Sequence, residues 1–151
     1  MQTNLLPSKN ILTRSSGYLK EVCSHSLNPY SGCGFGLSSC GVGCYVRFNP
    51  WLTRGRKWGE FVDIKINAEQ LYRQTVTREK NWAHKRAIPF TVFMSSSTDP
   101  WQPAEKKYRI TRAILQAMRD EPPDTLILQT HSANILDDQE TLQELSQRCN
   151  L

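Results

Sequence analysis

The fold class is indicated most clearly by residues 62–94, which read VDIKINAEQLYRQTVTREKNWAHKRAIPFTVFM. Val62, Ile64 and Ile66 alternate with polar residues, and this period of two predicts a strand that Asn67 ends. Residues 68–85 follow with apolar side chains at helical spacing, so we expect a helix there. Pro89 interrupts the helical pattern, and the apolar run 90–94 predicts a second strand. Strand, helix and strand in this order indicate a βα unit of a parallel sheet.

The same alternation extends outward from this unit. We predict a strand within 19–27, a helix over 104–120, a strand over 125–129 and a helix over 138–148. Residues 1–17 are polar and lack a clear period, so they are expected to form a leader or arm on the surface. Residues 18–151 would then form the α/β core. The last helix is not followed by the strand that the alternation requires, which predicts an architecture truncated at the C-terminus.

Three loops follow the predicted strands, and each is rich in polar residues, glycine or proline. They are the cysteine loop after the first strand, residues 95–105 after the third strand and residues 130–134 after the fourth. Functional sites of parallel sheets gather at the carboxyl ends of the strands. We therefore expect the three loops to lie on one rim and to contribute to one site.

Composition and charge narrow the class of protein. The chain has 151 residues, of which 38% are hydrophobic, and no apolar run approaches the roughly 20 residues of a membrane helix. A folded cytoplasmic protein without a membrane partner is expected. Lys and Arg number 19 against 14 Asp and Glu, giving a net charge of +5 that favours a polyanion such as a nucleic acid. Because the basic residues are spread along the sequence, this indication is weak.

Five cysteines are present, and three of them lie close together in the pattern Cys33-x6-Cys40-x3-Cys44. Three thiolates on a glycine-rich loop suit a soft metal centre. An iron–sulfur cubane with three protein ligands keeps one iron free for substrate, whereas structural zinc takes four protein ligands. Zinc completed by Cys23 or His25, and free thiols, remain open alternatives. Cys23 and Cys149 fit buried structural positions better.

Aromatic and basic residues follow the cysteine loop. Trp51, Trp58, Arg54, Arg56 and Lys57 are able to stack on bases and neutralise phosphates, or to pack as an amphipathic connection under the core.

Two further segments, together with the cysteines, carry a resemblance to a known family. The first is Ser26-Leu27-Asn28-Pro29-Tyr30-Ser31-Gly32-Cys33, which leads into the cysteines through Cys44-Tyr45. The second is Ser97-Thr98-Asp99-Pro100-Trp101-Gln102-Pro103-Ala104-Glu105, followed by Tyr108-Arg109-Ile110-Thr111-Arg112. Over residues 26–151 the chain resembles radical S-adenosylmethionine proteins related to spore photoproduct lyase, a DNA-repair enzyme.

The resemblance implies a partial (β/α)6 TIM-like barrel in which Cys33, Cys40 and Cys44 hold a [4Fe–4S] cluster. S-adenosyl-L-methionine would chelate the fourth iron, and reductive cleavage of its sulfonium would give a 5′-deoxyadenosyl radical. An electron donor such as flavodoxin or ferredoxin is implied as a partner. The substrate is open, with DNA or another nucleic acid as one candidate. The rival class is a small zinc-binding module that recognises nucleic acid without catalysis.

The resemblance also implies cofactor contacts. Tyr45 follows the last cysteine, where it would cover the cluster or its ligand, or simply pack. Ser97, Thr98 and Asp99 correspond to the loop that holds the methionine end of the ligand, although Asp99-Pro100 also suits an ordinary turn. His131 and Ser132 stand where relatives often have Lys-Ser facing the ligand carboxylate. The cysteine gaps of six and three residues depart from the C-x3-C-x2-C of most of the superfamily, and residues 34–39 lengthen the first gap.

Overall fold

The computed structural model describes residues 1–38, 40 and 43–151, and it confirms a mixed α/β fold with parallel strands. Two sheets are present in this part of the chain, and neither closes into a barrel. One sheet has the order β1-β5-β4, and the other has the order β2-β3-β6-β7. Their bounds are Gln2–Leu6 (β1), Leu12–Arg14 (β2), His25–Leu27 (β3), Tyr30–Ser31 (β4), Phe61–Lys65 (β5), Thr91–Met94 (β6) and Thr125–Leu128 (β7).

The parallel pairs are β1 with β5, β3 with β6 and β6 with β7. Two antiparallel pairs, β2 with β3 and β4 with β5, complete the sheets. The short segment between β3 and β4, Asn28-Pro29, therefore carries one stretch of chain from one sheet to the other. Because the cysteine loop begins directly after β4, this passage places it at the carboxyl ends of β3 and β6.

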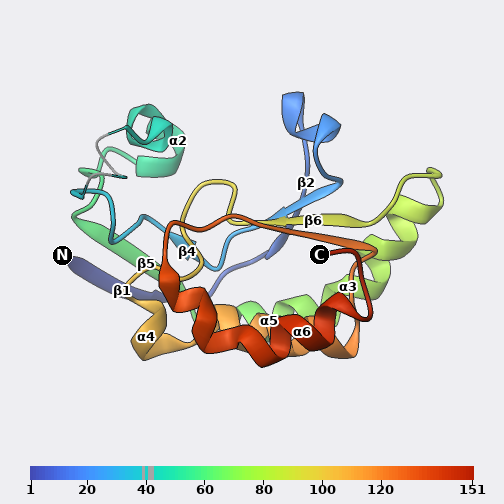
Figure 1. Cartoon of the computed structure of the whole chain (residues 1–151). Helices are drawn as coiled ribbons and strands as arrows, with labels where there is room; N and C mark the ends of the chain where they lie inside the picture. The colour runs from blue at the N-terminus through green and yellow to red at the C-terminus, as the bar shows by residue number, and fades with distance from the viewer. Residues whose placement is uncertain (39, 41–42) are drawn as a thin grey trace.

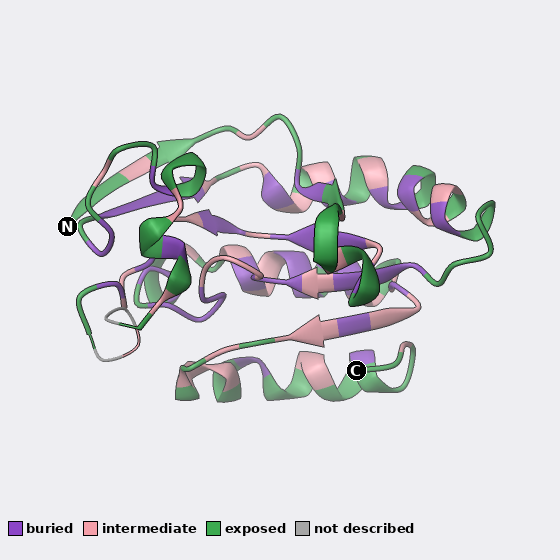
Figure 2. Cartoon of the chain, turned by 90° about the horizontal axis from the view of Figure 1, so that it is seen from above, coloured by how far each residue is buried: buried purple, intermediate pink, exposed green. Residues whose placement is uncertain are grey.

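Helices cover one side of the strands. Figure 1 shows α3 (Ala68–His84), α5 (Ile110–Asp120) and α6 (Gln139–Ser146) together beneath the strands, with the short α2 (Pro50–Thr53) on the opposite side. The main core lies between the four-stranded sheet and these three helices, and Figure 2 shows many strand residues buried and the outer helix faces exposed. The main core includes Leu27, Tyr72, Val76, Val92, Met94, Trp101, Ile114, Leu115, Met118, Leu126 and Leu145. No helix in the described residues is long and apolar enough to cross a membrane.

The N-terminal segment differs from the expected surface arm. Its backbone forms β1 and β2, and Ile11 and Leu12 are buried in the main core. The strand expected within 19–27 is shorter than predicted, because the 3₁₀ helix η1 (Gly17–Glu21) precedes β3. Strand pairing joins backbone groups from distant parts of a sequence, so a short segment without side-chain alternation gives little local indication of it.

The helix predicted over 104–120 is broken. Arg109 adopts a left-handed conformation between α4 (Glu105–Tyr108) and α5. The buried carboxylate of Glu105 accepts hydrogen bonds from the backbone N–H groups of Thr111 and Arg112 at 2.9 and 3.1 Å. It thereby satisfies free donors in the first turn of α5. Residues 133–138 form the 3₁₀ helix η3, so α6 begins one residue later than predicted.

Candidate functional site

The three loops expected on one rim meet around one cavity of about 390 Å³. Its walls come from the cysteine loop and the residues after it, from residues 95–99 after β6 and from Gln129 and His131 after β7. Phe35, Val46 and Trp58 supply apolar surface at its base. The geometry confirms the predicted convergence of the loops, since the carboxyl ends of β3, β6 and β7 lie side by side.

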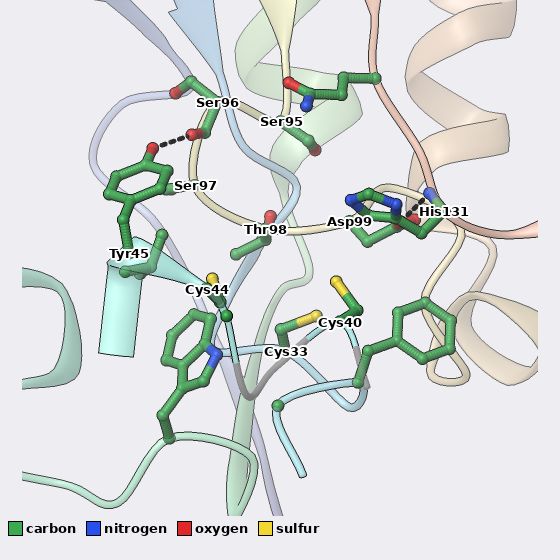
Figure 3. Close-up of a pocket in the computed structure, with 16 residues that line it drawn as sticks. Cys33, Cys40, Cys44, Tyr45, Ser95, Ser96, Ser97, Thr98, Asp99 and His131 are labelled. Atoms are coloured by element: carbon green, nitrogen blue, oxygen red, sulfur yellow. Dashed lines mark hydrogen bonds between the residues drawn. The ribbon is translucent and has the colours of Figure 1, made fainter. Parts of the chain in front are cut away.

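All three motif cysteines line the cavity. Figure 3 shows the sulfur atoms of Cys33, Cys40 and Cys44 on the same side of the hollow, with Thr98 and Asp99 across from them. Cys33 is 6% exposed, whereas Cys40 and Cys44 are half-buried. The two other cysteines lie elsewhere: Cys23 Sγ is 3.2 Å from Ser15 Oγ, and Cys149 Sγ contacts the carbonyl of Leu145. The three motif cysteines therefore share one cavity, and the two other cysteines lie outside it.

The environment of Cys33 disfavours an isolated negative charge. Burial raises the pKa of the Cys33 thiol to about 11, and the nearby Asp99 carboxylate and Cys40 add to this rise. Backbone hydrogen bonds from Phe35 and Asp99 act in the opposite direction. No Lys or Arg is among the described residues that line the cavity. A thiolate at this position therefore needs positive charge from a bound group, as metal centres provide.

The close approach of backbones fixes the start of the cysteine loop. Gly32 has φ +80°, and a Cβ at this residue would lie 2.3 Å from the carbonyl oxygen of Phe61. A Cβ on Gly36 would lie 2.4 Å from backbone atoms of Gly59. Only glycine fits at both places. Part of the glycine-rich composition therefore reflects tight packing rather than flexibility.

Two hydroxyl groups in the wall after β6 have no hydrogen-bond partner among the described residues. They are Ser95 Oγ and Thr98 Oγ1, and both atoms are buried. Ser95 also has φ 67°, a left-handed conformation that is uncommon for residues other than glycine. An unsatisfied buried hydroxyl costs about 1–3 kcal/mol, and such costs together with backbone strain gather at binding sites. Both residues line the cavity, while the two hydroxyl oxygens are themselves enclosed by protein.

Asn28 and Tyr45 hold this wall in place. The Oδ1 atom of Asn28 accepts hydrogen bonds from the backbone N–H and the hydroxyl of Ser97, at 3.1 and 3.0 Å. The hydroxyl of Tyr45 donates to the carbonyl of Ser96 at 2.5 Å, while its ring is largely exposed (Figure 3). Lys65 Nζ in turn donates to the carbonyl of Asn28 at 2.6 Å. Tyr45 thus links the cysteine loop to the wall through its hydroxyl.

Asp99 links the second loop to the third. Its Oδ1 accepts from the backbone N–H of Trp101 at 2.8 Å and from the Thr130 hydroxyl at 2.7 Å. Its Oδ2 accepts from the backbone N–H of His131 at 2.7 Å. The turn-capping role expected from Asp99-Pro100 is present, and the same carboxylate also positions the loop that carries His131. His131 lines the cavity from that loop (Figure 3).

Ser132 lies outside the residues that line the cavity. Its hydroxyl accepts a hydrogen bond from the backbone N–H of Asn134 at 3.2 Å and caps η3. Its backbone N–H donates to the hydroxyl of Thr130 at 3.0 Å. In this structure Ser132 shapes the loop, and His131 is the member of the predicted pair that reaches the cavity.

The aromatic and basic residues after the cysteines divide into two groups. Trp58 is buried in the cavity wall, whereas Trp51 is 87% exposed. Arg56 forms two hydrogen bonds with the Asp63 carboxylate, at 2.8 and 2.6 Å, and Lys57 pairs with Glu60 at 2.5 Å. The interpretation as packing therefore holds for Trp58, and Arg56 is already neutralised by an acidic partner.

Three polar residues were missed by the sequence reasoning as parts of this site. Asn28 holds the second loop, Gln129 lines the cavity, and Gln102 is fully buried against the start of the cysteine loop. Asn28 and Gln102 both belong to the segments that carry the family resemblance. Their place within these two segments was the available signal.

The cavity has features that fit a metal cluster with an organic ligand. They are three thiols, one of them deeply buried, backbone hydrogen bonds to Cys33, and two unpartnered hydroxyls on the opposite wall. Within residues 1–38, 40 and 43–151, no three His, Cys, Asp or Glu side chains are grouped so that they could hold a metal ion.

Comparisons with known proteins add one relative. Over 121 residues the chain is 31% identical to an uncharacterized protein of Methanocaldococcus jannaschii. The aligned region is 80% of this chain and 40% of the relative, so the chain spans less than half of that protein's length. No protein-family model and no solved structure matches the chain.

Proposed function

We propose that this chain belongs to the α/β enzymes that hold a metal cluster at the carboxyl edge of parallel strands. More particularly, we propose a radical S-adenosylmethionine enzyme that resembles spore photoproduct lyase. Cys33, Cys40 and Cys44 would bind a [4Fe–4S] cluster, and the wall after β6 would bind S-adenosyl-L-methionine. The observation that carries the proposal is the meeting of three separate loops, with three thiols and two unpartnered hydroxyls, around one cavity.

When bound, the cluster and S-adenosylmethionine supply one-electron cleavage of the sulfonium, which yields a 5′-deoxyadenosyl radical. The residues of the chain bind and orient the two groups. Ser95, Thr98 and the Ser97 segment would hydrogen-bond the polar end of the ligand, and His131 would face it from the third loop. Asp99 would act mainly by holding that loop in place, because three protein groups already donate to its carboxylate.

Exclusion of water from the thiols is the second contribution of the chain. Trp58, Phe35 and Val46 surround the buried side of the cavity, and Cys33 itself is almost inaccessible. A dry surrounding strengthens the interaction between thiolates and cationic groups. It also protects a reactive organic radical from side reactions.

The wide cysteine spacing is compatible with this assignment. Residues 34–36 of the longer first gap are held by packing, since Gly36 lies directly against Gly59. The additional residues of the gap therefore follow a segment next to Cys33 that is already fixed by packing. Cys40 and Cys44 come from the later part of the loop and still reach the same cavity.

The finer features of the fold and partners belong to the same proposal. The two sheets would form part of a (β/α)6 barrel, and a flavodoxin or ferredoxin would supply electrons. A nucleic acid is one candidate class of substrate, and the net charge of +5 is consistent with it. The supporting observation for the barrel is the parallel order β3-β6-β7 with helices on one side.

The test is anaerobic reconstitution with iron and sulfide, followed by electron paramagnetic resonance of the reduced protein with and without S-adenosylmethionine. We expect a [4Fe–4S]⁺ signal that changes when the ligand is added. Cys33→Ser, Cys40→Ser and Cys44→Ser should each abolish it. Cys23→Ser and Cys149→Ser are matched controls outside the cavity and should retain it. A colourless protein that takes up zinc instead of a cluster would replace this proposal with the zinc-module alternative.

A further inference from the structure

We propose that Gln102 is a positioning residue that fixes the cluster-binding conformation of Cys33 by clamping the peptide groups on both sides of it. The side chain of Gln102 is fully buried. Its Oε1 accepts a hydrogen bond from the backbone N–H of Gly34 at 2.7 Å, and its Nε2 donates to the backbone carbonyl of Gly32 at 3.3 Å. The role toward a cluster rests on the proposed function, whereas the clamp itself does not.

The clamp determines the direction of one thiol. Gly32 and Gly34 flank Cys33, and each would be conformationally free without an external contact. Because the carbonyl before Cys33 and the N–H after it are both bound to one side chain, the backbone of Cys33 is held in one conformation. The Cα–Cβ bond of Cys33 then aims its sulfur into the cavity (Figure 3).

An amide is the side chain that this task requires. The clamp needs one donor and one acceptor on the same planar group, and Gln supplies both from a single end. Glutamate at this position would accept from Gly34 but, while ionised, would have no hydrogen to donate to Gly32. Methionine has a similar length and shape but offers neither bond with comparable strength.

Gln102 is itself held firmly. Its backbone carbonyl accepts from the N–H of Glu105 at 2.8 Å, and the neighbouring Trp101 donates through Nε1 to the buried Asp138 carboxylate at 2.7 Å. The next residue, Pro103, lies against the cysteine loop, since a Cβ on Gly34 would be 3.1 Å from its Cδ. The turn that carries Gln102 is therefore anchored by contacts outside the cysteine loop that it positions.

The same short segment also holds the third loop. Asp99 binds the N–H of His131, and Gln102 lies three residues further along. Residues 99–102 thus connect the wall that would hold the organic ligand to the thiol that would hold the metal. A molecule that orders this wall should also order Cys33, and the two binding events should favour each other.

The experiment compares Gln102→Met and Gln102→Glu with the parent and with Gln116→Met, a control on the exposed face of α5. The first readout is amide hydrogen exchange at Gly34 in the metal-free protein. We expect Gln102→Met to exchange at least about tenfold faster at Gly34, because its hydrogen-bond acceptor is lost. Gln102→Glu should stay close to the parent there, since a carboxylate still accepts this bond.

The second readout is the alkylation rate of Cys33 at one pH in a background where the other four cysteines are serine. We expect faster alkylation in Gln102→Met and in Gln102→Glu, because each loses the bond to Gly32, and no change in Gln116→Met. Unchanged exchange and unchanged alkylation in Gln102→Met would overturn the clamp. If Gln102→Met does not fold, the split between Gly34 exchange and Cys33 alkylation in Gln102→Glu decides the question.

The third readout connects the clamp to the cluster and uses variants with all native cysteines. We expect less iron per chain after reconstitution of Gln102→Met, and a shifted reduction potential for the cluster that does form. If the parent binds no cluster, the proposed function fails while the first two readouts still test the clamp. If the parent binds a cluster and Gln102→Met matches it in iron content and potential, the positioning role is wrong.

Discussion

The two ends of the four-stranded sheet differ in how completely their buried polar groups are hydrogen-bonded. At the amino end, the Glu79 carboxylate accepts hydrogen bonds from Arg14 at 2.8 Å, from Arg78 at 2.8 Å and from His25 at 3.1 Å. At the carboxyl end, Ser95 and Thr98 present buried hydroxyls without partners among the described residues. Both ends bury polar atoms; among the described residues Glu79 at the amino end and Asp99 at the carboxyl end are fully paired, whereas the hydroxyls of Ser95 and Thr98 are not.

This difference in hydrogen bonding indicates different roles for the two ends of the sheet. The buried Glu79 carboxylate joins β2, β3 and α3 through the partly exposed Arg14 and the buried His25, and Arg14 also stacks 4.3 Å from the centre of the Trp82 ring. Buried hydroxyls without a hydrogen-bond partner lower the stability of the free protein. We therefore assign a structural role to the His25–Glu79 end, whereas the binding role of the cysteine end is part of the proposed function.

The largest expected effect comes from breaking the amino end. Glu79→Ala should lower the free energy of unfolding by about 3 kcal/mol, because it leaves His25 and Arg14 without their common buried partner. Urea unfolding followed by circular dichroism measures the change. Glu144→Ala, which removes an exposed partner of Arg119, is the matched control and should leave the free energy of unfolding nearly unchanged. Equal costs for the two variants would contradict the structural assignment.

Low pH should weaken the hydrogen bonds of Glu79 at the same end of the sheet in the unmodified protein. Burial acts to raise the pKa of Glu79, but the hydrogen bonds from Arg14, Arg78 and His25 outweigh it and lower the pKa from its ordinary 4.5 to about 2. A carboxylate with a lowered pKa stabilises the fold fully above pH 4.5, and the contribution of about 3 kcal/mol is lost as the pH falls toward 2.

Unfolding free energies measured from pH 6 to pH 2 test this sign. Glu79→Gln should show a weaker fall in stability over the range 4.5 to 2 than the parent does. Burial lowers the pKa of His25, so its protonation also opposes folding and adds to the loss below its ordinary 6.5. A parent whose stability stays constant between pH 4.5 and pH 2 would refute the account of Glu79.

At the carboxyl end, removal of a hydroxyl should have the opposite sign. Thr98→Val should raise the free energy of unfolding of the metal-free protein by about 1 kcal/mol, because a buried unpartnered hydroxyl is replaced by a methyl group. Affinity for S-adenosylmethionine in the reconstituted protein should fall. Thr130→Val is the matched control, since its hydroxyl donates to Asp99, and it should destabilise the protein. Destabilisation by Thr98→Val would show that its hydroxyl has a structural partner.

The smallest effect is expected at Ser132. Ser132→Ala should cost about 0.5 kcal/mol through loss of the cap on η3. It should leave affinity for S-adenosylmethionine unchanged, whereas Ser97→Ala should weaken it. Thermal unfolding and ligand titration of both variants make the measurement. A large loss of affinity in Ser132→Ala would mean that the serine turns toward the cavity when ligand is present.

The repeated βα pattern and the meeting of the three loops at one edge are predictable from the amino-acid sequence. Residues 62–66 and 68–85 were predicted as strand and helix, and the structure has them at Phe61–Lys65 and Ala68–His84. Their side chains repeat with the period of the local backbone, so the signal is contained in a few adjacent residues. The meeting of three loops followed from the parallel order alone.

Features that depend on contacts between distant residues are visible in the folded structure and not in the sequence pattern. β1 pairs with β5 across nearly sixty residues, and Gln102 reaches Gly32 and Gly34 across about seventy. Neither contact leaves a periodic trace in the sequence, because backbone groups are identical in every residue. The same holds for the opposite roles of buried Glu79 and Thr98: a side chain's type fixes what it is able to bind, and the fold decides whether its partner is another residue or a ligand.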